Sequence, residues 1–270
     1  MTLNTENLRG RFREMHQHGC FVIPNPWDVG SAKTLAHLGF KAIATTSAGY
    51  AWSQGQSDTQ LNLSTVLEHL RQMVKATHLP VNADFESGFA VGADQVNKNV
   101  ALALETGISG LSIDDSTGDR HRPIRDIGDA VDRIQAAYAA TSTTKAILVG
   151  RADNFLYGNP DLDDTIARLA AYSKAGADCL YAPGLQTRDQ IMAVVQAVAP
   201  KPVNIVIGSA GNFDVQELAE MGVRRVSVGG SLARVAMGSF LEASRILAEQ
   251  GKFDGLAGAM SGSELNKLFA

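Results

Sequence analysis

The sequence predicts a (β/α)8 barrel of the TIM type, a closed ring of eight parallel strands each followed by a helix, forming a single domain over residues 1–270. Three observations predict this fold class. From residue 21 onward, short runs rich in Val, Ile and Ala alternate with longer amphipathic segments, as in parallel sheets that helices bury on both faces. Unusual polar residues recur at the ends of these runs, which meet at one mouth in a barrel. The length of 270 residues is ordinary for one such barrel.

Eight segments are predicted as strands because each is short, apolar and bounded by polar or turn-forming residues. An open, doubly wound sheet could hold as many strands, but it usually carries a glycine-rich turn after its first strand. Residues 24–32 (PNPWDVGSA) contain no such turn, which favours the closed barrel. In chain order, the predicted strands are residues 21–25, 41–47, 80–85, 109–115, 146–153, 178–183, 201–207 and 224–230.

Helices are predicted between the strands, where apolar residues recur at three- and four-residue spacing. Several helical segments end in a glycine just before the next strand, and Gly107, Gly176 and Gly222 suit the left-handed position that follows a helix. Two longer polar loops are candidate lids over the mouth. The clearest helical patterns cover residues 63–77, 92–107, 163–177 and 213–222, helical segments are also expected over 1–20 and 231–270, and the two loops are 48–62 and 116–126.

The composition excludes several classes of protein. A net charge of -4 and a pI near 5.9 provide no basic stripe for nucleic acid. The N-terminus is polar, and no run approaches the roughly 18 apolar residues of a membrane span. We therefore expect a cytoplasmic protein without nucleic-acid or membrane partners. Cys20 and Cys179 lie in apolar segments and are expected to be reduced core residues.

Two pairs of carboxylates end neighbouring predicted strands. In N-A-D-F-E-S-G (82–88), Asp84 and Glu86 are two residues apart, so a strand directs both to one face. Two anions so close are costly unless a cation lies between them. Asp114 and Asp115 end the next strand in S-I-D-D-S (112–116), and such an oxygen-ligand site suits Mg²⁺, with Mn²⁺ as the alternative. A helix-start carboxylate and a solvated loop residue remain the alternative for the first pair.

Further polar groups are expected at the same mouth. Arg151 ends the fifth strand, and its fork of donors matches a substrate carboxylate, although a salt bridge to Asp153 or Asp84 would also explain it. Residues 47–49 (Ser47, Ala48 and Gly49) end the second strand, where a hydroxyl and backbone amides could hold a carboxylate or an oxyanion. Turn formation alone would also account for them.

Other chemistries are disfavoured by the positions of the remaining residues. A Schiff-base aldolase requires a lysine near the mouth, whereas Lys41, Lys145 and Lys201 precede their strands and belong to the opposite face. Of the histidines, only His121 in the loop after the fourth strand is expected to reach the site, unless it is a solvated loop residue. The Gly-rich segment S-V-G-G-S-L-A-R (227–234) could cradle a phosphate or form a tight barrel turn.

At these residues the chain resembles the isocitrate lyase/phosphoenolpyruvate mutase superfamily over about residues 20–240. The resemblance implies a barrel enzyme, usually oligomeric, that binds Mg²⁺ and an α-oxocarboxylate or its enolate and makes or breaks a C–C or P–C bond. The matching motifs, in order, are F-V-I-P-N-P-W-D, T-T-S-A-G, G-Q-S-D, N-A-D-F-E-S-G-F, S-I-D-D, G-R-A-D, A-G-A-D-C-L-Y-A-P and P-V-N.

The resemblance also implies roles for individual residues. Asp84 would be the principal metal anchor, and Arg151 would hold the oxo-acid so that charge developing on the enolate oxygen meets positive charge. The further metal residues would be Asp58, Glu86 and Asp114, and the further substrate residues Ser47, Ala48, Gly49 and Asn204. Apart from the resemblance, we also expect Trp27 to contact the substrate and Arg151, Asp115 and His121 to be the catalytic residues.

The chain departs from the superfamily in three places. The lyases carry a Lys-Cys-Gly-His segment after the fourth strand, but this loop reads S-T-G-D-R-H-R-P here. The lysine and asparagine loop of the mutases is also missing. The glutamate that the lyases place after the sixth strand is replaced by Ala182, Pro183 and Gly184. These departures make isocitrate or methylisocitrate cleavage by the usual mechanism unexpected.

We therefore expect a Mg²⁺-dependent, lyase-type enzyme acting on a small α-oxo acid, by decarboxylation of an oxaloacetate-like substrate or by C–C cleavage. The alternatives are a phosphonate P–C bond hydrolase or mutase, in which Asp115, Ser116, His121 and Arg122 would serve the phosphonate, and a non-catalytic α-oxo acid binding protein. A homo-oligomer, dimer or tetramer, is expected from the superfamily. The amphipathic stretch 231–250 would be either an exchanged helix or an ordinary eighth helix.

Overall fold

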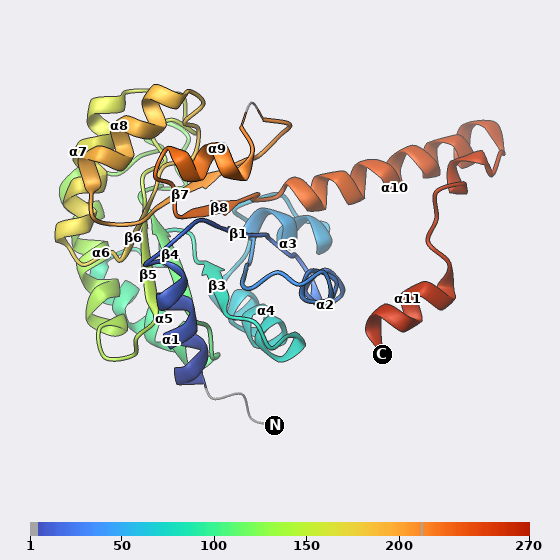
Figure 1. Cartoon of the computed structure of the whole chain (residues 1–270), viewed down its shortest axis with the longest axis horizontal. Coiled ribbons are helices and arrows are strands. Elements are labelled where there is room, and N and C mark those ends of the chain that lie inside the picture. The colour runs from blue at the N-terminus through green and yellow to red at the C-terminus, as the bar shows by residue number, and fades with distance from the viewer. Residues whose placement is uncertain (1–4, 212) are drawn as a thin grey trace.

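The computed structural model describes residues 5–211 and 213–270 and confirms the predicted barrel (Figure 1). Its eight strands pair in parallel in the order β1-β8-β7-β6-β5-β4-β3-β2. The first and last strands of this order, β1 and β2, meet and close the ring. There the backbone N–H of Ala44 donates to the carbonyl oxygen of Pro24 at 3.0 Å. The strands are β1 (Phe21–Ile23), β2 (Ile43–Ala44), β3 (Val81–Asp84), β4 (Gly110–Asp114), β5 (Ile147–Arg151), β6 (Cys179–Tyr181), β7 (Val203–Val206) and β8 (Arg225–Ser227).

Helices cover the outside of the ring, and each predicted strand contains the observed one. The predicted helical patterns match observed helices, although α7 begins at Leu162, one residue before the predicted 163–177. Gly107, Gly176 and Gly222 have φ values of 94°, 113° and 89°, as expected for residues that end helices in the left-handed region. The helices are α1 (Thr5–Met15), α2 (Val29–His37), α3 (Ser47–Ser53), α4 (Leu63–Ala76), α5 (Ala93–Glu105), α6 (Ile127–Thr141), α7 (Leu162–Lys174), α8 (Arg188–Val198), α9 (Val215–Glu220), α10 (Ser231–Gln250), the 3-10 turn η1 (Asp254–Leu256) and α11 (Gly262–Phe269).

The strands separate two apolar clusters because successive side chains alternate between their faces. On β3, Val81 and Ala83 pack against the helices, whereas Asn82 and Asp84 point into the barrel. The inner cluster is small and includes Phe12 of α1, which reaches the bottom of the barrel. The rest of the interior is polar. The buried residues of the inner apolar cluster are Phe12, Ile23, Ala42, Ala44, Ile147, Val149 and Cys179.

The loop prediction for residues 48–62 is wrong in its first part. Residues 47–53 form the short helix α3, which begins because the side chain of Thr46 accepts the backbone N–H of Gly49. The predicted loop 116–126 is present and folds back on itself, since Ser116 and Ile124 form an antiparallel bridge. Cys179 is buried as predicted, while Cys20 is only half-buried; both thiols are free.

Helix α10, which follows the last strand, leaves the barrel and extends away from it (Figure 1). Helix α11 packs on α2, where the ring of Phe269 lies 3.8 Å from the position of a Cβ on Gly30. Along α10 the large apolar side chains are exposed, and Phe240 retains 68% of its accessible surface. Of the helices in the described chain, α10 included, none combines the length and apolar character needed to cross a membrane.

The bottom of the barrel depends on the absence of a side chain at Gly110. A Cβ there would lie 2.8 Å from the carbonyl oxygen of Ile147 and 3.0 Å from a ring carbon of Phe12. We therefore expect Gly110→Ala to lower the free energy of unfolding by about 1–3 kcal/mol, as other overpacked sites do. Urea unfolding measures the change.

The matched control for this substitution is Gly10→Ala in the middle of α1, where a new Cβ meets no atom within 4 Å. Alanine should raise the free energy of unfolding there by about 0.5–1 kcal/mol, because it restricts the unfolded chain. Equal urea midpoints for the two variants would show that the bottom of the barrel does not require a glycine at position 110.

Candidate active site

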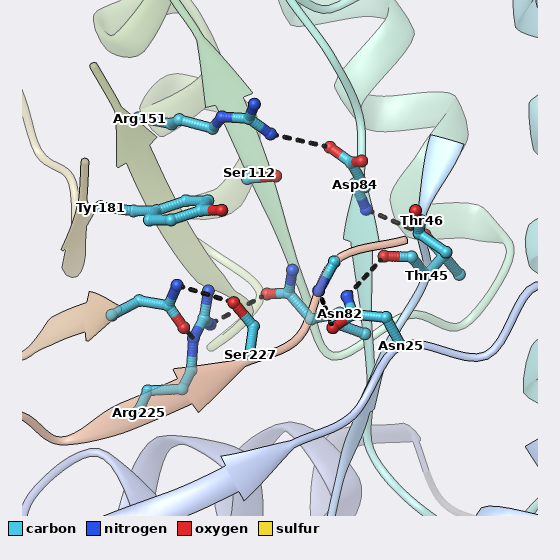
Figure 2. Close-up of a pocket in the computed structure, with 13 residues that line it drawn as sticks. Asn25, Thr45, Thr46, Asn82, Asp84, Ser112, Arg151, Tyr181, Arg225 and Ser227 are labelled. Atoms are coloured by element: carbon cyan, nitrogen blue, oxygen red, sulfur yellow. Dashed lines mark hydrogen bonds and ion pairs between the residues drawn. The ribbon is translucent and has the colours of Figure 1, made fainter. Parts of the chain in front are cut away.

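A pocket opens at the carboxyl ends of the strands and extends into the barrel (Figure 2). Charged groups lie at one end of it and mostly neutral amides and hydroxyls at the other. The residues that line it are Asn25, Ala44, Thr45, Thr46, Asn82, Asp84, Ser112, Arg151, Tyr181, Asn204, Arg225, Ser227 and Gly229. This position at the mouth is where barrel enzymes carry their chemistry.

Asp84 is the central carboxylate of the charged end. Its Oδ2 atom accepts both the backbone N–H of Ser47, at 3.1 Å, and the hydroxyl of Ser47, at 3.0 Å. Its Oδ1 atom faces Nη1 of Arg151 at 3.7 Å, and Figure 2 shows the two side chains pointing toward each other across the pocket. Asp84 is thus oriented by the first residue of α3 and by Arg151 rather than by solvent.

Arg151 is held by a second carboxylate. Its Nε donates to Oδ1 of Asp153 at 2.5 Å, and its guanidinium carbon lies 5.2 Å from the ring centre of Tyr181. Burial by itself would lower the pKa of Arg151, but Asp153, Tyr181 and Asp84 raise it well above its ordinary value. Arg151 is therefore a permanent cation, and both salt bridges considered from the sequence are present.

The other carboxylates of this end repel one another. The pKa of Glu86 is raised to about 8 by burial and by the negative charges of Asp84, Asp114 and Asp58. Burial also raises the pKa of Asp114, whose Oδ1 accepts the N–H and the hydroxyl of Ser116 at 3.1 Å and 2.7 Å. Asp58 keeps an exposed surface at the rim, yet partial desolvation and Asp84 raise its pKa too.

The same residues fit a divalent cation. The Oε1 atom of Glu86 is buried and has no hydrogen-bond partner, and the Glu86 backbone is held in the left-handed region with φ 47°. Within residues 5–211 and 213–270, no three acidic, His or Cys side chains already converge as a complete ligand set. Mg²⁺ does not require one, because it usually keeps several waters and binds through one or two carboxylates plus substrate oxygens.

The structure places Asp115 away from the pocket. Its carboxylate accepts the hydroxyl of Tyr172 at 2.7 Å, Nη1 of Arg168 at 3.2 Å and the backbone N–H of Asp153 at 2.8 Å. These contacts join β4 to α7, so Asp115 positions the segment that carries Asp153. The side chain of His121 is exposed on the loop after β4, outside the lining of the pocket. Neither side chain therefore lines the pocket.

The predicted carboxylate cradle at 47–49 is largely engaged by the protein itself. Ser47 donates to Asp84, and the N–H of Gly49 donates to the hydroxyl of Thr46 at 3.2 Å. A Cβ on Gly49 would lie 3.1 Å from Cβ of Trp27, so these two residues pack together beside α10. Trp27 therefore lies outside the lining of the main pocket, while Ala48 is half-buried beside it in α3.

The neutral end of the pocket contains residues that sequence reasoning missed. Asn204 was expected there and lines the pocket, but it is fully buried, accepting Nε of Arg225 at 2.8 Å and donating to Ser227 at 3.0 Å. Asn82 and Arg225 were not anticipated because they lie before the strand ends. The period of two on β8 could have indicated Arg225, since one of two consecutive arginines in an apolar strand must face inward.

The Gly-rich segment after β8 does not form an open phosphate cradle. The backbone N–H groups of Val228 and Gly229 both donate to Oδ1 of Asn25 at 2.9 Å. A Cβ on Gly230 would lie 2.9 Å from the ring of Trp52. The glycines thus allow close packing of the barrel turn, which was the alternative interpretation of this motif.

Comparisons with known proteins agree with this geometry. In a structure from Burkholderia cenocepacia J2315, provisionally described as a lyase/mutase, 46% of residues are identical, with a TM-score of 0.95 and coverage of 98% of this chain and 97% of that chain. Oxaloacetate decarboxylase 1 of Pseudomonas fluorescens (strain Pf0-1) is 26% identical over 84% of this chain and 80% of its own length. An uncharacterized protein of Mycobacterium tuberculosis (strain ATCC 25618 / H37Rv) is 29% identical over 81% of each chain.

The superfamily resemblance that the motifs indicated is confirmed by a family model. The model described as phosphoenolpyruvate phosphomutase matches residues 12–248, which include every strand of the barrel and all the residues of the pocket. The chain therefore belongs to the phosphoenolpyruvate phosphomutase family.

Proposed function

We propose that the protein is a Mg²⁺-dependent lyase that decarboxylates a small α-oxo acid of the oxaloacetate type. The observation that carries this proposal is the permanent cation Arg151 facing Asp84 in the pocket, with Glu86, Asp114 and Asp58 close enough to Asp84 for their charges to repel one another. Such a site can hold an oxo-acid next to a divalent cation. The similarity to an oxaloacetate decarboxylase supports the same reaction class.

The metal would be held by Asp84 with Glu86, Asp114 and Asp58 around it, and would supply positive charge to the oxo oxygen as it becomes an enolate oxygen. Arg151 adds a fixed positive charge at the same place. Because Arg151 is already oriented by Asp153 and Tyr181, it needs no rearrangement when charge develops.

The carbanion equivalent left by CO2 must then take up a proton. Tyr181 lines the pocket beneath Arg151, and burial raises its pKa to about 12, so its hydroxyl is protonated at neutral pH. Decarboxylation requires no base to remove a proton from a substrate hydroxyl. This suits a chain whose loop after β4 lacks the lyase cysteine.

The phosphonate alternative is weakened by the contacts of the residues it would need. Asp115 is bound to Arg168 and Tyr172, and the hydroxyl of Ser116 donates to Asp114. Neither is free to receive a phosphonate. A binding protein would use the same contacts to the ligand but would form no product. Only a measurement of turnover distinguishes this alternative from the lyase.

The first test measures the rate at which the protein converts oxaloacetate to pyruvate and CO2 in the presence of Mg²⁺. A coupled assay detects the pyruvate. EDTA should abolish the protein-dependent rate, and Asp84→Asn should lower it by roughly 100-fold or more, as loss of a metal-linked group commonly does. The exposed Asp119→Asn, on the loop after β4, is the matched control and should retain the rate. Binding of pyruvate without any turnover would instead establish the binding protein.

The second test separates the roles of holding and stabilising the substrate. Because Arg151 meets charge that appears during the reaction, Arg151→Lys should lower kcat by roughly 10- to 100-fold and change KM less. Steady-state kinetics with oxaloacetate measures both. The exposed Arg188→Lys on α8 serves as the control. An increase in KM at unchanged kcat would show that Arg151 binds the substrate and does not stabilise the charge that develops during the reaction.

We also propose that a second copy of this chain covers the apolar face of α10, giving a homo-oligomer. Exposed apolar side chains continue from α10 through η1 to α11. They are more numerous than the singly scattered apolar residues of an ordinary protein surface, and such a concentration marks an interaction site. They are Leu232, Val235, Met237, Phe240, Leu241, Leu247, Phe253, Leu256, Met260, Leu265 and Phe269.

For the oligomer, the variant Phe240→Glu should shift the molecular mass measured by light scattering to that of one chain, because the interface would bury an unpaired charge. The control Gln250→Glu adds the same charge at the end of the helix and should leave the assembly intact. A wild-type protein that already has the mass of one chain would refute this proposal.

A further inference from the structure

The segment that follows β3 carries Glu86 and has an irregular backbone. Three of its residues, Glu86, Gly88 and Phe89, have φ values of 47°, 87° and 52°, in the left-handed region that residues other than glycine rarely adopt. The Oε1 atom of Glu86 is buried without a hydrogen-bond partner among the described residues. Neighbouring elements must hold this backbone in place, because its conformation is unfavourable by itself.

Two buried side chains bind the carbonyl oxygens of five consecutive residues in this segment, 87–91. Asn99 of α5 donates to the carbonyl oxygens at positions 88 and 89, both at 2.9 Å. Arg133 of α6 donates to those at positions 87, 90 and 91, the first two at 2.9 Å and 3.1 Å. Both side chains are buried, and α5 and α6 pack against each other outside the barrel (Figure 1). The path of the segment thus depends on these two helices.

Arg133 is also connected to the end of the next strand. Its Nε donates to Oδ1 of Asp129 at 3.3 Å, and Nη1 of Arg125 donates to Oδ2 of Asp129 at 2.9 Å. Arg125 in turn donates through Nε to the carbonyl oxygen of Ser116 at 3.1 Å and through its backbone N–H to that of Asp115 at 2.9 Å. Burial by itself would raise the pKa of Asp129, but the two arginines lower it, so the carboxylate stays ionised at neutral pH.

The two supported segments meet beside the pocket. The backbone N–H of Asp114 donates to the carbonyl oxygen of Glu86 at 3.0 Å. Burial raises the pKa of Glu86, and the charges of Asp84 and Asp114 raise it further, so these acids lie close together. Their repulsion would spread the segments apart unless the surrounding structure resists it. Arg133 is suited to this task, because a planar guanidinium bonds to several acceptors at once in a fixed geometry.

We propose that Arg133 is a positioning residue, which holds the segment of Glu86 in place so that the protein binds a divalent cation tightly. Asp129 and Arg125 extend the same support to the segment of Asp114. This inference rests on the proposed function, which assigns Glu86 and Asp114 to the metal. Arg133 does not line the pocket, so it acts through the backbone that it binds. Groups that orient metal ligands from behind commonly contribute roughly 10- to 100-fold to metal affinity.

The test measures the dissociation constant of Mn²⁺ for the whole chain without substrate, by electron paramagnetic resonance of the free ion. Arg133→Lys keeps the charge but loses the fork of donors, and it should raise this constant by roughly 10- to 100-fold. Asp129→Asn, at an exposed position, should raise it by about fivefold, the loss of one hydrogen bond. At saturating Mg²⁺ both variants should recover the wild-type kcat with oxaloacetate, because neither side chain lines the pocket.

Arg9 of α1 provides the matched control. It is also buried, and it donates to the carbonyl oxygens of Leu104 at 2.9 Å and Ile108 at 3.0 Å. These two residues precede β4, at the opposite end of the barrel from the pocket. Arg9→Lys should therefore lower the urea midpoint and leave the dissociation constant of Mn²⁺ unchanged. Urea unfolding shows whether each variant is folded, and Asp129→Asn keeps the test valid where Arg133→Lys does not fold.

The outcomes separate this inference from the proposed function. If the folded Arg133 and Asp129 variants bind Mn²⁺ as tightly as the wild type, the positioning role is wrong while the lyase remains. Equal losses in Arg9→Lys and Arg133→Lys would show general destabilisation and would also overturn it. A wild-type protein that binds Mn²⁺ without turnover refutes the lyase, and the variants still test Arg133. If the wild type neither binds Mn²⁺ nor converts oxaloacetate, both proposals fail.

Discussion

The site depends on the placement of one permanent cation among several carboxylates at the end of a closed barrel. Arg151 offsets the charges of Asp153 and Asp84, but burial and the neighbouring acids still raise the pKa values of Glu86 and Asp114. A cluster of this kind is stable with partly protonated acids or with an added cation. The protein thereby holds a place for positive charge beside a guanidinium, and this is where the proposed function places the oxo-acid and its enolate.

The barrel interior serves this arrangement by being only partly apolar. Branched side chains usually fill the layers of such barrels. Here Phe12 closes the bottom, and above it Asn82, Asn204 and Arg225 form a hydrogen-bonded layer. That layer leaves a polar floor beneath the charged mouth. The two ends of one pocket are therefore differently charged.

Membership of the phosphoenolpyruvate phosphomutase family coexists with changes in the parts of the site that select a leaving group. The loop after β4 folds back through its Ser116 and Ile124 bridge and carries neither the lyase cysteine nor the mutase lysine. Asp115 ties β4 to α7 through Arg168 and Tyr172 rather than facing the substrate. The residues to which the proposed function assigns the metal and the oxo-acid are present, and the decarboxylation we propose requires no further acid or base from this loop.

Local patterns in the sequence determined the eight strands, the glycines that end helices and the carboxylates at the mouth, because period, turn chemistry and strand polarity act over a few residues. They could not decide where the side chains of Asp115 and Trp27 would point, nor that Ser47 would bond to Asp84 across the sheet. Those outcomes depend on partners 37 or more residues away for Ser47 and Asp115. Arg225 is the clearest case: the sequence contains the arginine, but only the closed barrel leaves it buried without an anion, because its neighbours arrive from other strands.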